Sequence, residues 1–282
     1  MKSVAQEYTS SFGFQWLKHA KTQLDSFVGK PISRNRLFAV TGWPARMKGQ
    51  RILEAGSGAG RFTEVLLITG AEVWSFDSSE AVEANRANNG HHPNLHLFRA
   101  DIFNIPRDIG LFDKVLCLGV LQHTPDPQHA FLELAEFVRP EGGEVVIDVY
   151  KKTLLARLQW KYFLRPFTRW IPDRVLYMLV RLIVPILLSL TIVAYKMLGR
   201  LGTRLSPIAS YPALGLPYKI HKEWSILDTF DMYSPRYDNP QTLRAVRKWF
   251  TKGGLKDIEV RYGQNGIVGK GKKSLTFDIA KG

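Results

Sequence analysis

The sequence has one cysteine among its 282 residues, Cys117, and this scarcity excludes two kinds of small scaffold. A single thiol cannot form an internal disulfide, and it cannot supply the paired thiolates of a cysteine-based zinc site. Histidines are also few, and His91, His92 and His96 are loosely spaced with no nearby pair of acids, so we predict no metal site. Residues 1–8 lack an apolar core, so we expect no signal peptide and a cytoplasmic location.

Acidic residues are in the minority, 25 against 39 lysines and arginines, and most of them lie in one stretch. Residues 51–150 carry 15 acidic and 7 basic side chains, whereas residues 151–200 carry 10 basic side chains and one acid. The basic charge therefore lies around an acidic middle segment. Such a shell suits a nucleic acid or an anionic membrane surface as a partner.

Between residues 51 and 150 short apolar runs alternate with helical stretches, which is typical of a parallel α/β sheet. We expect strands at residues 51–55, 72–76, 95–99, 112–118 and 144–150, with helices at 61–69, 79–89 and 127–138. The alternation resumes later, with a helix from Asn239-Pro240 to about Lys252, a strand at 257–261 and a last strand near 266–279. We therefore predict a Rossmann-like α/β domain formed by residues 49–150 and 223–282, with a helical cap at 1–48 and a helical insertion at 151–222.

The first expected strand runs into a glycine-rich turn, Glu54-Ala55-Gly56-Ser57-Gly58-Ala59-Gly60, and then into a helix. This arrangement places bare backbone beside a ligand at the carboxyl end of a sheet. The dinucleotide fingerprint requires the spacing G-x-G-x-x-G, but its third glycine position holds Arg61, which would obstruct the close approach of helix and strand. The E-x-G-x-G-x-G spacing instead resembles motif I of methyltransferases. That resemblance implies that the loop wraps the amino-acid end of S-adenosylmethionine and that Glu54 reaches the ammonium of this cofactor, directly or through water.

Polar residues also follow the next strands. Asp77, with Ser78 after it, ends the second strand about 20 residues past the loop, where an acid accepts hydrogen bonds from both ribose hydroxyls. Asp101 follows the third strand; in methyltransferases an acid there faces the adenine amino group, while the next apolar residue, Ile102, packs on the ring. After the fourth strand, Leu118-Gly119 resembles the segment that lines the methyl-donor pocket of methyltransferases. Four such features at the ends of four successive strands favour S-adenosylmethionine over NAD.

Over about residues 50–150 the sequence resembles a bacterial family of class I S-adenosylmethionine-dependent methyltransferases, the broad group that includes the quinone-biosynthesis and type 11 enzymes. The resemblance implies a doubly wound, mostly parallel sheet of seven strands with an antiparallel last strand. Residues 12–16 and 227–235 also resemble segments of uncharacterised members, some of them associated with surface-polysaccharide gene neighbourhoods. The resemblance does not supply a methyl acceptor.

Methyl transfer is an in-line displacement at a sulfonium carbon, so it first requires alignment of donor and acceptor. A general base is needed only if the acceptor must lose a proton. His123, after the fourth strand, is our candidate base, and a local hydrogen bond in the following turn is the alternative. Asp148 and Tyr150 share one face of the fifth strand and are further catalytic candidates. Aromatic residues that could form a lid over the substrate are Tyr8, Trp16, Tyr233 and Tyr237.

Residues 175–198 form a long apolar run in which only Arg181 and Lys196 are charged. The run is long enough to cross a bilayer. However, the strands before and after it belong to one sheet, which a single crossing would divide, and Arg181 and Pro185 also disfavour crossing. Three interpretations stay open: a lid packed on the sheet, a helix in the membrane interface with the basic and aromatic side chains of residues 157–174 near headgroups, or an oligomer interface.

We therefore predict an S-adenosylmethionine-dependent methyltransferase that acts on a small or lipid-linked molecule, with a hydroxyl of a sugar or lipid-like acceptor as its target. An RNA or protein methyltransferase is the alternative that the basic charge supports. The apolar run disfavours nucleic acid, and no Asn-Pro-Pro-Tyr-type signature follows the fourth strand. The second alternative, a non-catalytic cofactor-binding or membrane-scaffolding protein, conflicts with the intact loop and both acids. We expect a cytoplasmic protein that can lie at the inner face of the membrane, and the sequence does not determine its oligomeric state.

Overall fold

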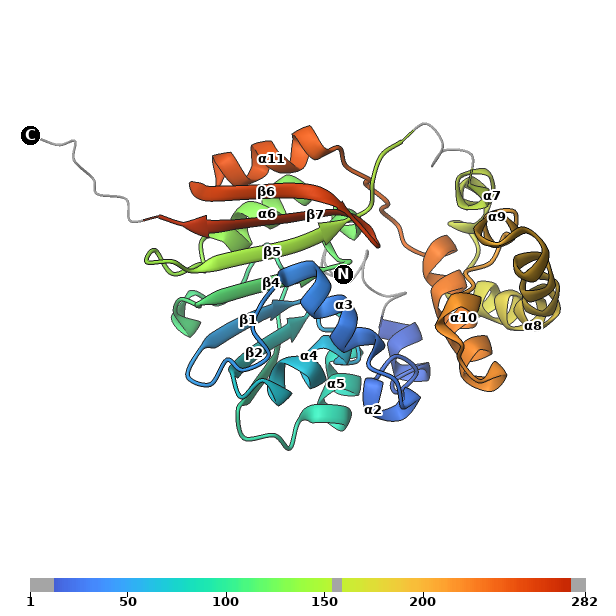
Figure 1. Cartoon of the computed structure of the whole chain (residues 1–282), viewed down its shortest axis with the longest axis horizontal. Coiled ribbons are helices and arrows are strands. Elements are labelled where there is room, and N and C mark those ends of the chain that lie inside the picture. Colours follow the sequence, from blue (N-terminus) through green and yellow to red (C-terminus); the bar gives the residue numbers. More distant parts are fainter. Residues whose placement is uncertain (1–12, 154–158, 275–282) are drawn as a thin grey trace, which may run out of the picture.

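The computed structural model describes residues 13–153 and 159–274, and seven strands form one sheet within them. The strands lie in the order β3-β2-β1-β4-β5-β7-β6, and β7 is antiparallel to both of its neighbours, so it alone opposes the other six (Figure 1). This confirms the predicted Rossmann-like sheet and its antiparallel last strand. The strand bounds are β1 Arg51–Ala55, β2 Glu72–Asp77, β3 Leu95–Arg99, β4 Lys114–Leu118, β5 Glu144–Val149, β6 Leu255–Gly263 and β7 Gly266–Lys273.

Helices cover both faces of the sheet because the buried strands are apolar on both sides. On one face, Phe131 of α6 (Pro127–Ala135) and Phe250 of α11 (Leu243–Lys252) pack in one apolar cluster with Val145 and other sheet residues. On the other face, α3 (Ile32–Thr41) and α4 (Arg61–Ile68) pack against β1, β2 and β4, with α5 (Ala81–Asn89) beside α4. Every position of β5 is buried, which fits a central strand.

Several element boundaries differ from the sequence-based expectations. The helix expected from Asn239-Pro240 begins at Leu243, because the side chain of Thr242 accepts the backbone N–H of Ala245. Asn239 instead donates from its side-chain amide to the carbonyl of Thr124. The helix expected over 127–138 ends at Ala135, the one expected at Ser79 begins at Ala81, and the strand expected from Phe112 begins at Lys114. Residues 275–279 of the expected last strand lie outside the described residues.

Between β5 and α11 the chain forms a separate helical lobe beside the sheet (Figure 1). The lobe has its own apolar core, in which Leu176, Val184 and Leu188 of α8 pack with Ile226 and Phe230 of α10. The predicted domain boundary at residue 222 falls inside α10, and this helix packs on α8 as part of the lobe. The lobe contains α7 (Trp160–Thr168), α8 (Asp173–Leu198), α9 (Arg200–Arg204), the 3-10 turn η4 (Pro212–Leu214) and α10 (Tyr218–Tyr233).

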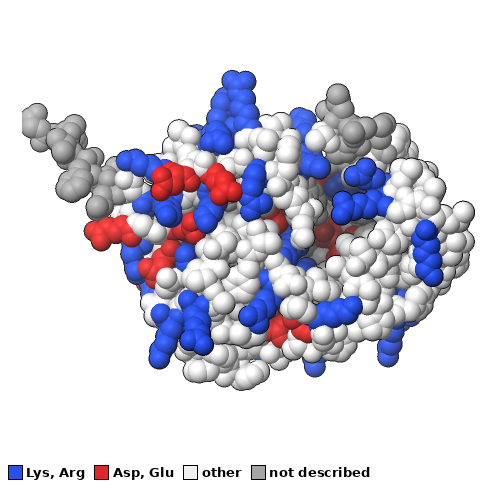
Figure 2. Space-filling view, in the orientation of Figure 1, with Lys and Arg blue, Asp and Glu red and all other residues white. Residues whose placement is uncertain are grey.

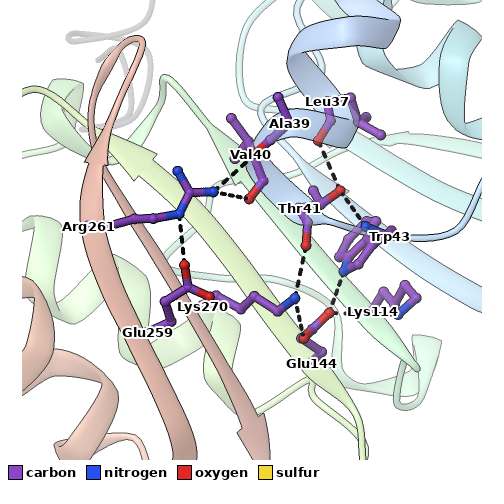
Figure 3. Close-up of polar contacts among 10 residues, drawn as sticks. All are labelled: Leu37, Ala39, Val40, Thr41, Trp43, Lys114, Glu144, Glu259, Arg261 and Lys270. Carbon is purple, nitrogen blue, oxygen red and sulfur yellow. Dashed lines mark hydrogen bonds and ion pairs between the residues drawn. The ribbon is translucent and has the colours of Figure 1, made fainter.

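The N-terminal segment contains helical residues 13–18, α2 (Asp25–Val28) and α3, and a polar network holds the end of α3 and the residues after it on the sheet (Figure 3). Lys270 of β7 donates to the carbonyl of Thr41 at 3.0 Å and pairs with Glu144 of β5 at 3.2 Å. Glu144 also accepts from the indole N–H of Trp43. Arg261 of β6 donates to the carbonyl of Ala39 at 3.1 Å. These contacts fix the end of α3, and Arg36 of the same helix reaches Asp148 near the carboxyl end of β5.

Candidate functional site

A cavity of about 830 Å³ lies at the carboxyl ends of the parallel strands, between the sheet and the helical lobe. Figure 2 shows the surface hollowed at this place, with acidic and basic groups at the bottom of the hollow. Ligand pockets typically have volumes of about 300–1,000 Å³. The cavity can therefore hold a nucleoside-sized cofactor together with part of a second molecule.

The glycine loop forms one wall of the cavity with Gly56, Ser57 and Gly58. Gly56 and Gly58 have positive φ angles of 77° and 53°, which glycine adopts without strain. A Cβ at Gly56 would lie 2.3 Å from Cγ2 of Val120, so this glycine also permits the close approach of the segment after β4. A Cβ at Gly58 would lie 3.1 Å from the indole of Trp16, which covers the loop from the N-terminal helix and also lines the cavity.

Asp77 joins the end of β2 to the glycine loop and lines the cavity. Its Oδ2 accepts the backbone N–H of Gly58 at 2.9 Å, and its Oδ1 accepts the N–H and hydroxyl of Ser79 at 2.9 and 2.7 Å. Ser78 lines the cavity beside it. These three hydrogen bonds use three of the about four lone-pair sites of the carboxylate, so Oδ2 keeps one site for a donor of a ligand beside the bare loop backbone.

Three residues expected at the cofactor lie outside the cavity lining. Oε2 of Glu54 accepts from Thr63 and Ser75 at 2.6 and 2.8 Å behind the loop, and burial raises the pKa of this carboxyl to about 7. Gly60 packs against α5, where an added Cβ would lie 2.2 Å from Oδ1 of Asn85. Oδ1 of Asp101 accepts the N–H of Phe103. Both neighbours of Asp101, Ala100 and Ile102, line the cavity.

His123 follows β4 and Tyr150 follows β5, and both side chains line the cavity beside Leu118 and Gly119. The two rings meet edge to face with their centroids 5.4 Å apart. Nδ1 of His123 lies 3.1 Å from the backbone oxygen of Tyr237. Because a carbonyl can only accept, Nδ1 carries the proton and the lone pair of the neutral ring is on Nε2. Burial lowers the pKa of His123 and raises that of Tyr150 well above its usual value, so at neutral pH both are uncharged.

Asp148, the third catalytic candidate, is 1% exposed and is engaged by two side chains. Its Oδ2 accepts from Nη2 of Arg36 at 2.8 Å, and its Oδ1 accepts from the amide of Asn265 at 3.2 Å. Arg36 and Asn265 both line the cavity, whereas Asp148 lies behind them. The structure therefore places Asp148 as the support of two cavity residues.

The lobe contributes a polar roof that the sequence analysis missed. Asp228 and Asp231 of α10 line the cavity together with Tyr211. Asp228 accepts from the hydroxyl of Tyr211 and from the amide of Gln23 at 3.0 Å, and burial raises its pKa to about 6. Asp228 and Asp231 are three residues apart, which puts both acids on one face of a helix. This spacing is visible in the sequence.

Arg61 and Gln23 connect this roof to the helix that follows the glycine loop. Nη1 of Arg61, at the start of α4, donates to Oε1 of Gln23, whose amide in turn donates to Asp228. Burial lowers the pKa of Arg61 to about 10, so it stays charged at neutral pH. Of the aromatic lid candidates, Trp16 lines the cavity, Tyr233 packs in the lobe core and Tyr8 lies outside the described residues.

Comparison with known proteins agrees with this geometry. The family model described as "Methyltransferase domain" (type 11) matches residues 53–146, which run from β1 to β5. The chain is 31% identical over 144 residues to the ubiquinone biosynthesis O-methyltransferase of Aromatoleum aromaticum, covering 46% of this chain and 58% of that protein. It is 30% identical over 114 residues to the enzyme of the same name from Coxiella burnetii, covering 40% and 48%. The chain thus spans about half the length of the curated relatives it matches.

A solved structure shows the same fold. An O-methyltransferase family protein from Burkholderia thailandensis superposes with a TM-score of 0.51 at 12% identity, covering 89% of this chain and 59% of that one. In the part of this chain that is described, no group of three or more His, Cys, Asp or Glu side chains that could hold a metal ion occurs. Residues 53–146, which carry the glycine loop and Asp77, thus match a methyltransferase domain, in agreement with the predicted resemblance to class I S-adenosylmethionine-dependent methyltransferases.

Proposed function

We propose that this protein transfers the methyl group of S-adenosylmethionine to a hydroxyl of a small or lipid-linked molecule held between the sheet and the lobe. The observation that carries the proposal is the junction at Asp77, where one carboxylate holds the N–H of Gly58 and also lines the cavity. The names of the curated relatives, which are O-methyltransferases, support the choice of oxygen as the methylated atom.

The residues present fit the cofactor. We assign the amino-acid end of the cofactor to Gly56, Ser57 and Gly58, its ribose to Asp77 and Ser78, and the apolar wall beside the adenine to Ile102. Leu118 and Gly119 border the donor methyl group in this assignment. Glu54 and Gly60 shape the loop from behind, and Asp101 acts through the turn in which it lies.

The chemistry at the acceptor follows from His123. When bound, S-adenosylmethionine supplies a methyl group on a positively charged sulfur. A hydroxyl acceptor would lose its proton on methylation, and Nε2 of His123, the ring nitrogen that carries the lone pair, would be the group that takes it. Tyr150 packs edge to face on this ring and fixes its orientation. The acids of α10 can accept hydrogen bonds from further hydroxyls of the acceptor, which favours a polyhydroxylated, sugar-like group.

An RNA substrate is disfavoured by the same roof. Asp228 and Asp231 present carboxylates to the cavity from the lobe, and these repel phosphate. The exposed basic side chains of the lobe lie in segments that also expose large apolar side chains, which a nucleic-acid surface does not need.

Two experiments test the proposal. Calorimetry with S-adenosylhomocysteine must show binding that is lost in Asp77→Ala and kept in Glu72→Ala, an acid at the opposite end of the same strand. Incubation of lipid and sugar-nucleotide extracts with radiolabelled methyl donor must then give a labelled product whose methyl group is on oxygen. Absence of S-adenosylhomocysteine binding by the unaltered protein would contradict the cofactor assignment, and label on nitrogen or carbon would contradict the choice of hydroxyl.

A further inference from the structure

The longest helix of the lobe, α8, has two apolar faces. One face is buried against α10 through Val180, Val184 and Leu188. The opposite face is exposed although it is apolar: Leu182 is 63% exposed, Ile186 68% and Leu190 62%. These residues follow each other at intervals of four, so they form one stripe along the helix, and Val175, Val193 and Met197 continue it at both ends.

Neighbouring elements of the lobe also expose apolar side chains. In α7 and the turn after it, Phe163, Phe167 and Trp170 are 57%, 73% and 77% exposed. In and after α9, Leu201 and Leu205 are more than half exposed. Single exposed apolar side chains are ordinary on a soluble protein, but a contiguous surface of them marks an interaction site. We call the exposed apolar residues of α7, α8 and α9 the outer lobe face.

The charge around the outer lobe face is almost entirely positive. Between residues 160 and 222 only Asp173 is acidic. Figure 2 shows the lobe as largely uncharged surface with scattered basic groups, in contrast to the mixed charges over the sheet. Aromatic residues lie beside the basic ones, as Trp170 does beside Arg169. The exposed basic residues are Arg169, Arg174, Arg181, Lys196, Arg200, Arg204 and Lys219.

Exposed apolar side chains surrounded by basic ones, with aromatic rings at the boundary, match the surface of an anionic bilayer. A second copy of the chain fits poorly, because the same basic side chains would meet across the contact. Crossing the bilayer also fits poorly, although α8 is long and apolar enough. The buried face of α8 packs on α10, which presents Asp228 and Asp231 to the cavity, and the chain on both sides of the lobe belongs to one sheet.

We propose that the outer lobe face docks on the surface of a membrane containing anionic phospholipid, with α8 lying in the interface. The lobe then has two functions on opposite sides: α8 faces the lipid and α10 forms the roof of the cavity. Under the proposed function, this brings the cavity within reach of an acceptor whose lipid part stays in the bilayer. Docking can be measured without methyl transfer, so failure of the docking proposal can be distinguished from failure of the proposed function.

Vesicle flotation with the full chain tests the docking. We expect the protein to float with vesicles of phosphatidylcholine and phosphatidylglycerol, to float much less with phosphatidylcholine alone, and to be released by salt. Ile186→Ser should weaken vesicle binding roughly tenfold, because it removes an apolar side chain that docking buries in the bilayer interface. Arg174→Glu should weaken binding by a similar factor because it reverses a charge at the lipid surface.

Matched changes on the core serve as controls. Ile68 of α4 is 70% exposed, so Ile68→Ser changes an equally exposed side chain away from the lobe, and Arg244→Glu on α11 makes the same charge reversal there. Both should float like the unaltered protein, and all variants should bind S-adenosylhomocysteine normally. Equal flotation with neutral and anionic vesicles, or equal effects of Ile186→Ser and Ile68→Ser, would overturn the proposal. A dimer in sedimentation that Ile186→Ser dissociates, without vesicle binding, would assign the face to a second copy instead.

Discussion

Asp77 and Gly58 are joined by a hydrogen bond of 2.9 Å from the loop N–H to the carboxylate at the end of the neighbouring strand. The same carboxylate holds Ser79 through its other oxygen, so one side chain orders the turns after both β1 and β2. The order of the loop and the affinity for the cofactor are therefore coupled through a single residue. A substitution of Asp77 at the end of β2 should therefore alter the glycine loop that follows β1.

Asp77→Ala should weaken binding of S-adenosylhomocysteine by roughly 10- to 100-fold, because one lost hydrogen bond to a charged group is worth about 1.5–3 kcal/mol. Hydrogen exchange should show the amide of Gly58 becoming less protected, since its acceptor is gone. Titration calorimetry and exchange measured by mass spectrometry check the two effects. Normal affinity in this variant would show that Asp77 is a loop support without a part in binding.

Gly56→Ala should destabilise the fold more than its backbone angle alone explains. Gly56 and Gly49 have similar positive φ angles, 77° and 81°, but only at Gly56 would a Cβ meet a neighbour, Cγ2 of Val120 at 2.3 Å. We expect Gly49→Ala to cost about 1 kcal/mol of unfolding free energy and Gly56→Ala about 2 kcal/mol or more. The double variant with Val120→Ala should recover part of the difference. Urea unfolding measures all four proteins, and equal costs at the two glycines would contradict the close contact with Val120.

Much of this fold could be predicted because its local signals agree with one another. The loop at Gly56 and Gly58 follows a strand of apolar residues and precedes a helix, so its place at the carboxyl end of the sheet follows from the order of elements. Asp77 could be assigned to the site by the same reasoning. The bounds of β1 and β3 agree with the expected ranges, because the side-chain pattern of a strand stops at each end.

The rest depended on contacts between distant segments, which a local pattern does not contain. The pairing of Asp148 with Arg36 joins residues 112 positions apart, so its role as a support could not be seen from the alternation along β5. The same holds for Glu54, whose partners Thr63 and Ser75 lie behind the loop. The acids of α10 were missed because the predicted boundary at residue 222 assigned that helix to the core.

Glu54→Gln should change the pH dependence of stability. Burial gives the Glu54 carboxyl a pKa of about 7 in the folded protein against 4.5 normally, so the native state binds more protons than the unfolded state between these values. Stability from this group is therefore lost as the pH rises from about 4.5 to about 7, by roughly 3 kcal/mol. The Gln side chain does not titrate, so the variant should lack this loss. Thermal unfolding of both proteins across this pH range measures the difference, and parallel curves would contradict it.

His123→Asn should lower the rate of methyl transfer by about 100-fold or more, the usual contribution of a general base. The Asn amide can still donate to the carbonyl of Tyr237 as Nδ1 does, but it lacks the lone pair on Nε2. Binding of S-adenosylhomocysteine should stay normal. The measurement is initial rates with labelled donor and the acceptor from the extract screen, across pH. Because burial lowers the pKa of His123, the activity of the unaltered protein should persist to a lower pH than an exposed histidine would allow. Activity retained in full by His123→Asn would assign the proton to another group.

Asp148→Asn should act on stability and only indirectly on methyl transfer. The substitution leaves the guanidinium of Arg36 beside a neutral amide in a place where the carboxylate is 1% exposed. Removing one partner of a buried pair costs about 3 kcal/mol or more, whereas an exposed pair contributes about 0–1 kcal/mol. Glu133→Gln, which breaks the exposed pair with Arg107, is the matched control and should change little. Urea unfolding gives the stabilities, and the double variant with Arg36→Met should be less unstable than the two single changes added together. A normal unfolding midpoint combined with lost turnover would instead return Asp148 to the catalytic group.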